Sequence, residues 1–150
     1  MTLELNEEAW RDFQILINMY LDSSEKILQE DKYLVPIAAF LNDGQPQFQA
    51  ISMEDTTSGI DTKEHLTHYR KYLSNMPENT QACILGYDIK IQYENYNDAI
   101  AIELQHSNGT HQKMFVPYRF SGLFKNKLEM GQSKLVDESL EPILNSASNN

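Results

Sequence analysis

Asp98-Ala-Ile-Ala-Ile-Glu-Leu-Gln-His106 is the stretch of sequence that decides the fold. Its large apolar residues stand at every second position, which is the period of a β-strand with one buried face. The tripeptide Ser107-Asn-Gly109 follows it, and the next segment ends with Phe115-Val-Pro-Tyr118. Asparagine and glycine between two such segments predict a β-hairpin.

The length of the hairpin loop determines which residues face each other. A three-residue loop with Gly109 in the left-handed region would pair Ile102 with Met114. The same register sets Glu103 opposite Lys113, a favourable cross-strand pair on the solvated face. A two-residue loop would lose that pair, so we predict the three-residue loop.

A long strand should precede the hairpin, because residues 83–93 are apolar at every odd position. The even positions from Asp88 onward are polar, so we expect the odd positions to form the buried face and the even ones the wet face. A turn at Asn95-Tyr-Asn97 would join this strand to the next. Gly86 interrupts the pattern, which indicates a bulge or a close backbone contact. We expect a helix to pack over the sheet there, and a bound ligand is the alternative.

The N-terminal half predicts two helices and a second hairpin. Apolar residues spaced three and four apart predict a helix from Asn6, its capping residue, to Gln29. Strands at Leu34–Leu41 and Gln47–Met53 should form a hairpin through Asn42-Asp-Gly44. A capping box and a second apolar stripe predict a helix over residues 61–76.

The predicted order is α-β-β-α-β-β-β, an α+β fold whose antiparallel five-stranded sheet carries its helices on one face. This order resembles the topology of roadblock and profilin-like domains. We expect one domain over residues 1–145 and a disordered tail at 146–150. Residues 123–144 fit a helix or a further strand, and the sequence leaves that choice open.

Composition excludes several classes of protein. The chain has 150 residues, 41% of them hydrophobic, and a net charge of -10, so we expect a globular protein that binds no nucleic acid. It has no apolar stretch long enough to span a membrane and no leader sequence at Met1, so we expect a cytoplasmic protein. A single cysteine, Cys83, allows no internal disulfide and fits a buried position.

The sequence contains no motif of a known catalytic or cofactor site, and we expect no cofactor and no metal. The six glycines are isolated, so no phosphate-binding loop is present. His65 and His68 lie three apart on the second predicted helix, which lacks the ligand spacing of a zinc site. If the protein binds a small ligand, the first candidates lie on the C-terminal hairpin and its exit, where histidine could move protons and arginine could bind an anion; they are His106, His111, Tyr118 and Arg119.

Charge is distributed unevenly, which favours a role in binding. Residues 4–31 hold eight acids against two bases, and residues 113–134 hold five bases against one acid. The acidic helix, through Glu7, Glu8 and Asp12, is therefore the candidate surface for a protein partner or for a homodimer. We predict a small acidic protein-binding module, such as an adaptor, inhibitor or chaperone, without catalytic activity. The alternative is a ligand sensor or enzyme with a site assembled around the C-terminal strands.

The strand pattern as a whole resembles a family of short, uncharacterised bacterial proteins. The resemblance rests on the Asp-Ala-Ile start of Asn97–His106, on Asn108-Gly109 and on Val116-Pro-Tyr118. It spans residues 10–131, and Pro36, Asp43-Gly44 and Tyr87-Asp88 also fit it. Where the family has Glu-His near the hairpin, this chain has Gln105-His106, which puts any role of that acid in doubt. The resemblance implies a fold and no activity.

Overall fold

The computed structural model describes residues 2–32, 34, 36–49 and 79–136, and their fold is α+β. The helix predicted over residues 61–76 and the tail at 146–150 lie outside the described residues. The described elements are the helix α1 (Thr2–Asp31) and the strands β1 (Ile37–Asn42), β2 (Gln45–Gln49), β3 (Thr80–Tyr93), β4 (Tyr96–His106), β5 (His111–Ser121), β6 (Lys127–Met130) and β7 (Lys134–Leu135).

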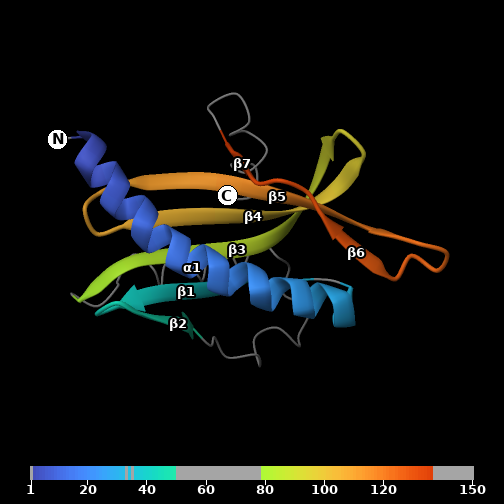
Figure 1. Cartoon of the computed structure of the whole chain (residues 1–150), viewed down its shortest axis with the longest axis horizontal. Coiled ribbons are helices and arrows are strands. Elements are labelled where there is room, and N and C mark those ends of the chain that lie inside the picture. The colour runs from blue at the N-terminus through green and yellow to red at the C-terminus, as the bar shows by residue number, and fades with distance from the viewer. Residues whose placement is uncertain (1, 33, 35, 50–78, 137–150) are drawn as a thin grey trace, which may run out of the picture.

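The strands form one antiparallel sheet in the order β2-β1-β3-β4-β5-β6, with β7 paired to β5. The helix α1 runs obliquely across one face of this sheet (Figure 1). The predicted number of five strands is wrong, because the described residues alone form a sheet of seven. The two extra strands have four and two residues, which is too short for an alternating pattern to reveal them.

The register predicted for β4 and β5 is confirmed. Ile102 pairs with Met114, and Glu103 pairs with Lys113. The three-residue loop closes with a hydrogen bond from the Gly109 amide to the His106 carbonyl, at 3.0 Å, and Gly109 has a φ of +95°. The left-handed conformation is the reason for glycine at this position.

The hairpin of β1 and β2 is also confirmed. Its two-residue turn has Asp43 at φ 52° and Gly44 at φ 78°. Positive φ at both central residues characterises the turn type whose twist matches that of the strands. The turn between β3 and β4 lies earlier than predicted, at Glu94 and Asn95, and a register shift between Lys90 and Tyr93 precedes it.

The predicted placement of the helix on the odd face of β3 is wrong. The main core cluster joins Phe13, Leu16 and Tyr20 of α1 to Ala82 and Ile84, which are even positions of β3. The odd positions form a second buried cluster with β1 and β4, which consists of Ala38, Cys83, Leu85, Tyr87 and Ala101. Residues 82–85 are apolar on both faces, and such a continuous run is typical of a strand buried on both sides.

The helix α1 begins at Thr2, earlier than the predicted start, so Asn6 lies inside it and is not its cap. It ends where Lys32 adopts a φ of 67°, the left-handed conformation that commonly follows a helix. In the described part of the chain, no helix combines the length and the apolar composition that crossing a membrane requires.

Candidate functional site

The four candidate ligand residues do not converge on one place. His106 lies at the end of β4 that leads into the hairpin loop, whereas Tyr118 pairs with Asp98 near its other end. Eight residues of strand separate these positions, a distance of about 27 Å. His111 is exposed. No single small ligand can contact all of these side chains.

His106 is buried and paired with Asp12, which the sequence placed on a partner-binding surface. The His106 Nε2 and Asp12 Oδ2 atoms lie 2.7 Å apart, and the two side chains are 3% and 13% exposed. The edge of the Phe13 ring packs against the imidazole, with 5.9 Å between ring centroids.

The hydrogen bonds of His106 leave it no free nitrogen. Its Nδ1 accepts the backbone amide of Asn108 at 3.1 Å, so this nitrogen carries no proton. Nε2 then carries the proton and donates it to Asp12. A general base needs a nitrogen directed at its substrate, and here both are used to join α1 to the β4–β5 loop.

Sequence reasoning missed this pair because its members are 94 positions apart. One signal was present in the sequence. Asp12 lies on the side of α1 that carries Ala9, Phe13 and Leu16, which are all fully buried. An acid on an apolar helix face requires a buried partner.

Tyr118 belongs to a second polar cluster, which lies between α1 and β3. Its hydroxyl donates to Asp88 Oδ1 at 2.8 Å. Burial raises the pKa of Asp88 above its usual value, although the Tyr118 hydrogen bond acts in the opposite direction. Burial also raises the pKa of the Tyr20 phenol, on the adjacent part of α1. The hydroxyls of Tyr20 and Ser24 are buried and make no hydrogen bond in the described structure.

The raised pKa of Asp88 has a measurable consequence for stability. Because folding raises this pKa above 3.8, the folded state holds the proton more tightly, and stability falls as the pH rises from 3.8 through the raised value. The substitution Asp88→Asn removes this titration and keeps an oxygen to accept the Tyr118 hydroxyl. We expect the variant to gain stability relative to the wild type as the pH rises above 3.8, and we expect the gain to be small because Asp88 is only partly buried.

Urea unfolding across this pH range measures the difference. Glu30→Gln, at an exposed position of α1, is the matched control and should follow the wild type. If the difference in unfolding free energy between Asp88→Asn and the wild type did not change with pH, the prediction would be contradicted.

Arg119 forms an ion pair with an acid on the neighbouring strand β6. Its Nε and Nη2 atoms contact Glu129 Oε1 at 3.0 and 2.9 Å, and its guanidinium lies 5.2 Å from the centre of the Tyr96 ring. Hydrogen bonds from Ser121 and Arg119 lower the pKa of Glu129. Arg119 therefore braces the hairpin of β5 and β6 and is not set up to bind an anion.

Cys83 is buried, as the sequence predicted. Burial raises the pKa of its thiol to about 12, with the charge of Glu103 adding to the shift. The thiolate is the reactive form of cysteine, and burial disfavours that form at Cys83.

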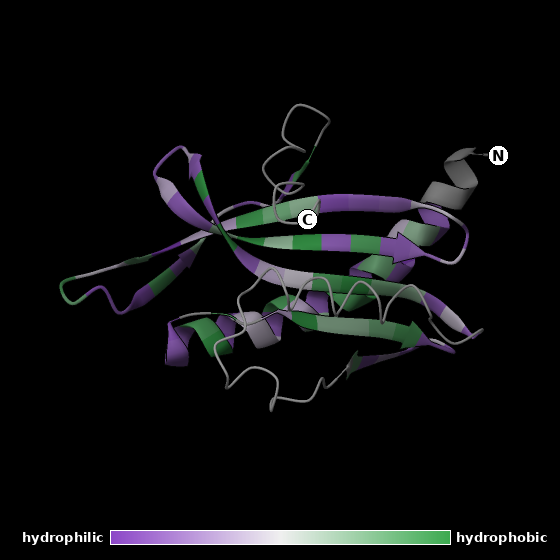
Figure 2. Ribbon diagram, turned by 180° about the vertical axis from the view of Figure 1, so that it is seen from behind, coloured by the Kyte–Doolittle hydropathy of each residue, from purple (hydrophilic) through white to green (hydrophobic). Residues whose placement is uncertain are grey.

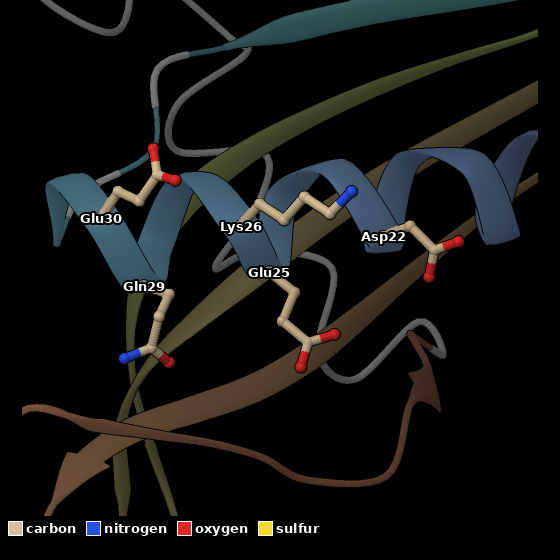
Figure 3. Close-up of a pocket in the computed structure, with 5 residues that line it drawn as sticks. All are labelled: Asp22, Glu25, Lys26, Gln29 and Glu30. Atoms are coloured by element: carbon tan, nitrogen blue, oxygen red, sulfur yellow. The ribbon is translucent and has the colours of Figure 1, made fainter.

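A hollow of about 500 Å³ has, among the described residues, a lining that comes from the C-terminal half of α1 (Figure 3). It is open to solvent, and its lining residues all carry polar or charged groups: Asp22, Glu25, Lys26, Gln29 and Glu30. In Figure 3 the side chains of Glu25 and Gln29 extend from the lower side of α1, and that of Glu30 extends from its upper side. Side chains from one exposed helix surface do not enclose a small molecule, but they do present three acids to a partner.

A second hollow, here called the groove, lies between α1 and the strands β5 and β7. It has a volume of about 440 Å³, and it is lined by Trp10, Gln14, Ile17, Asn18, Leu21, Met114, Ser133 and Leu135. Large apolar side chains dominate this lining. Leu135 is 56% exposed, so part of the groove's apolar surface remains open to solvent.

The loop between β5 and β6, here called the tip (residues 122–126), carries the most exposed large apolar side chains of the described residues. Leu123 is 90% exposed and Phe124 is 80% exposed. The hairpin projects away from the body of the sheet and is hydrophobic at its end (Figure 2). Two adjacent exposed apolar residues on a projecting loop are typical of an interaction surface.

The tip is held in place from two sides. The Gln29 side chain donates to the Asn126 carbonyl at 2.7 Å, and Ser121 Oγ donates to Glu129 Oε2 at 2.5 Å. The ammonium group of Lys32 lies 4.7 Å from the centre of the Phe120 ring. These contacts fix the hairpin against α1, so the tip presents its apolar pair in a preorganised position.

Among the described residues, no group of three or more histidine, cysteine, aspartate or glutamate side chains is arranged to hold a metal ion. No protein-family model matches the chain, and comparison with curated proteins and with solved structures gave no significant match.

Proposed function

We propose that the protein is a small protein-binding module and that it engages its partner through the tip. The observation that carries this proposal is the exposure of Leu123 and Phe124, at 90% and 80%, on a braced hairpin. Exposed apolar side chains cost solubility, and a protein gains from them when a partner covers them. A preorganised apolar pair also loses little entropy on binding.

The charges beside the tip indicate the chemistry of the partner. Lys125 and Lys127 are both exposed and follow the apolar pair in the sequence. A complementary surface would therefore combine an apolar pocket with acidic side chains at its rim, as in interfaces that have an apolar centre and a polar border.

The arrangement of the remaining candidates supports binding over catalysis. The ring nitrogens of His106 and the guanidinium of Arg119 are both engaged within the protein. His111 is exposed on β5, remote from Tyr118 along that strand. A reaction would need several of these groups around one substrate atom.

Site-specific photo-crosslinking tests the proposal. A photoreactive phenylalanine analogue at position 124 should capture one protein in an extract of the native cells, while the same analogue at position 48 should not. Phe48 is a suitable control because it is an exposed aromatic residue on β2, at 41% exposure. An excess of unlabelled wild-type protein should suppress the crosslink, and an excess of the Leu123→Ser/Phe124→Ser variant should not.

A charge-reversed variant, Glu7→Lys/Glu8→Lys, tests the acidic helix separately. Both residues are exposed, whereas Asp12 is excluded from this variant because its reversal would break the buried pair with His106. Loss of the crosslink in this variant alone would move the binding surface to α1. Equal crosslinking from positions 124 and 48 would contradict the proposed role of the tip.

A further inference from the structure

We propose that the partner of the tip is a second copy of this chain. Leu123 and Phe124 of each molecule occupy the groove of the other, so that two tips and two grooves form a symmetric dimer. This inference rests on the proposed function, because it identifies the protein that the tip binds. Exchange of identical contacts about a two-fold axis is the commonest form of association between identical chains.

The groove suits an apolar pair in size and in chemistry. Its volume is about 440 Å³, within the range of pockets that bury small molecules and large side chains. Trp10, Ile17 and Leu21 line it along α1, and Met114 lines it from the sheet. Aromatic side chains buried in such pockets dominate the binding energy of many interfaces.

The tip of a molecule cannot reach the groove of that same molecule. The hydrogen bond from Gln29 to the Asn126 carbonyl fixes the tip beside the C-terminal end of α1. The groove follows α1 from Trp10 to Leu21, and its centre at Ile17 lies twelve residues, or about 18 Å, from Gln29 along the helix axis. Another copy must therefore supply the apolar side chains.

The charges of the two surfaces are complementary. The tip brings Lys125, and Lys127 follows it at the start of β6; both are exposed. Acids occupy the helix beyond each end of the groove, with Glu7 before Trp10 and with Asp22 and Glu25 after Leu21. The same acids disfavour an anionic membrane as the occupant, since the tip is bound to the helix that carries them. A second copy offers both the apolar groove and the acids that the lysines require.

Sedimentation velocity of the purified protein tests the inference. The wild type should dimerise, and its association should weaken as salt is added. The tip variant Leu123→Ser/Phe124→Ser should weaken the dimer at least about tenfold. Asn18→Trp, which fills the groove from an exposed position, should have a similar effect. Phe48→Ser should leave the dimer unchanged.

Mixing the two dimer-breaking variants gives the decisive result. The Asn18→Trp protein keeps its tip and the tip variant keeps its groove, so the mixture should form a heterodimer through one remaining contact. Circular dichroism establishes that each variant is folded. A monomeric wild type, a dimer that survives both variants, or a mixture that stays monomeric would each overturn the inference.

The crosslinking experiment distinguishes failure of this inference from failure of the proposed function. A monomeric wild type that still crosslinks another protein from position 124 would overturn only the dimer. The absence of any crosslink from position 124 would overturn both the dimer and the proposed binding function.

Discussion

Replacing Gly86 with alanine is expected to lower the free energy of unfolding by about 3 kcal/mol or more. A Cβ atom at this position would overlap the Cζ, Oη and Cε2 atoms of the Tyr20 ring. Tyr20 is fully buried in the main core, so its ring has no open space to enter. The helix and the strand would have to separate, which disturbs the packing of α1 along the sheet.

A double-mutant cycle isolates this cause. Tyr20→Ala is itself expected to cost about 3–5 kcal/mol, but adding Gly86→Ala to it should cost little, because the ring that the Cβ overlaps is gone. Gly44→Ala is a useful comparison, since a Cβ there meets nothing within 4 Å and the cost comes only from its φ of +78°. Its expected loss is about 1 kcal/mol. Equal losses for Gly86→Ala in both backgrounds, measured by urea unfolding, would contradict the packing explanation.

Replacing Asp12 with alanine is expected to lower the free energy of unfolding by about 2–3 kcal/mol. The substitution leaves the Nε2–H group of His106 buried without its acceptor, while Nδ1 remains tied to the Asn108 amide. It also releases α1 from the loop that joins β4 to β5.

Two further variants separate the hydrogen bond from the charge of Asp12. Asp12→Asn retains an oxygen acceptor, so we expect it to lose about half as much stability as Asp12→Ala. Glu8→Ala removes an exposed acid from the same helix and should change stability by less than about 0.5 kcal/mol. Thermal and urea unfolding compare the three. If Asp12→Ala matched Glu8→Ala, the buried pair would contribute nothing to stability.

The parts of the fold that depend on near neighbours in the sequence were predictable. The β4–β5 register followed from a three-residue loop and the pairing of Glu103 with Lys113. The β1–β2 turn followed from Asp43 and Gly44. The role of Gly86 as a point of close helix packing is also confirmed. In the two hairpins the deciding residues lie within a few positions of one another. At Gly86 the absence of a side chain indicated the close contact.

The parts that depend on distant segments were not predictable. Alternation along β3 indicated an apolar odd face, but it could not tell which of two buried faces receives α1. The pair of Asp12 and His106 joins residues 94 positions apart, so neither residue reveals the other. The tip was missed for a different reason. Leu123 and Phe124 look like core residues in the sequence, and only the structure shows that they face solvent.

The order of the strands has a consequence for how the chain acquires its fold. Among the described strands, four pairings join consecutive strands: β1 with β2, β3 with β4, β4 with β5, and β5 with β6. Such hairpins close short loops rapidly. The helix α1 packs mainly on β3, which begins at Thr80, and on strands that follow it. During synthesis the apolar side of α1 therefore leaves the ribosome long before these strands have been made. We expect α1 to dock late, after the β3–β5 meander has formed, with Asp12 and His106 meeting among the last native contacts. The protein is therefore most prone to aggregation, and most accessible to chaperones, while only its N-terminal half has been synthesised.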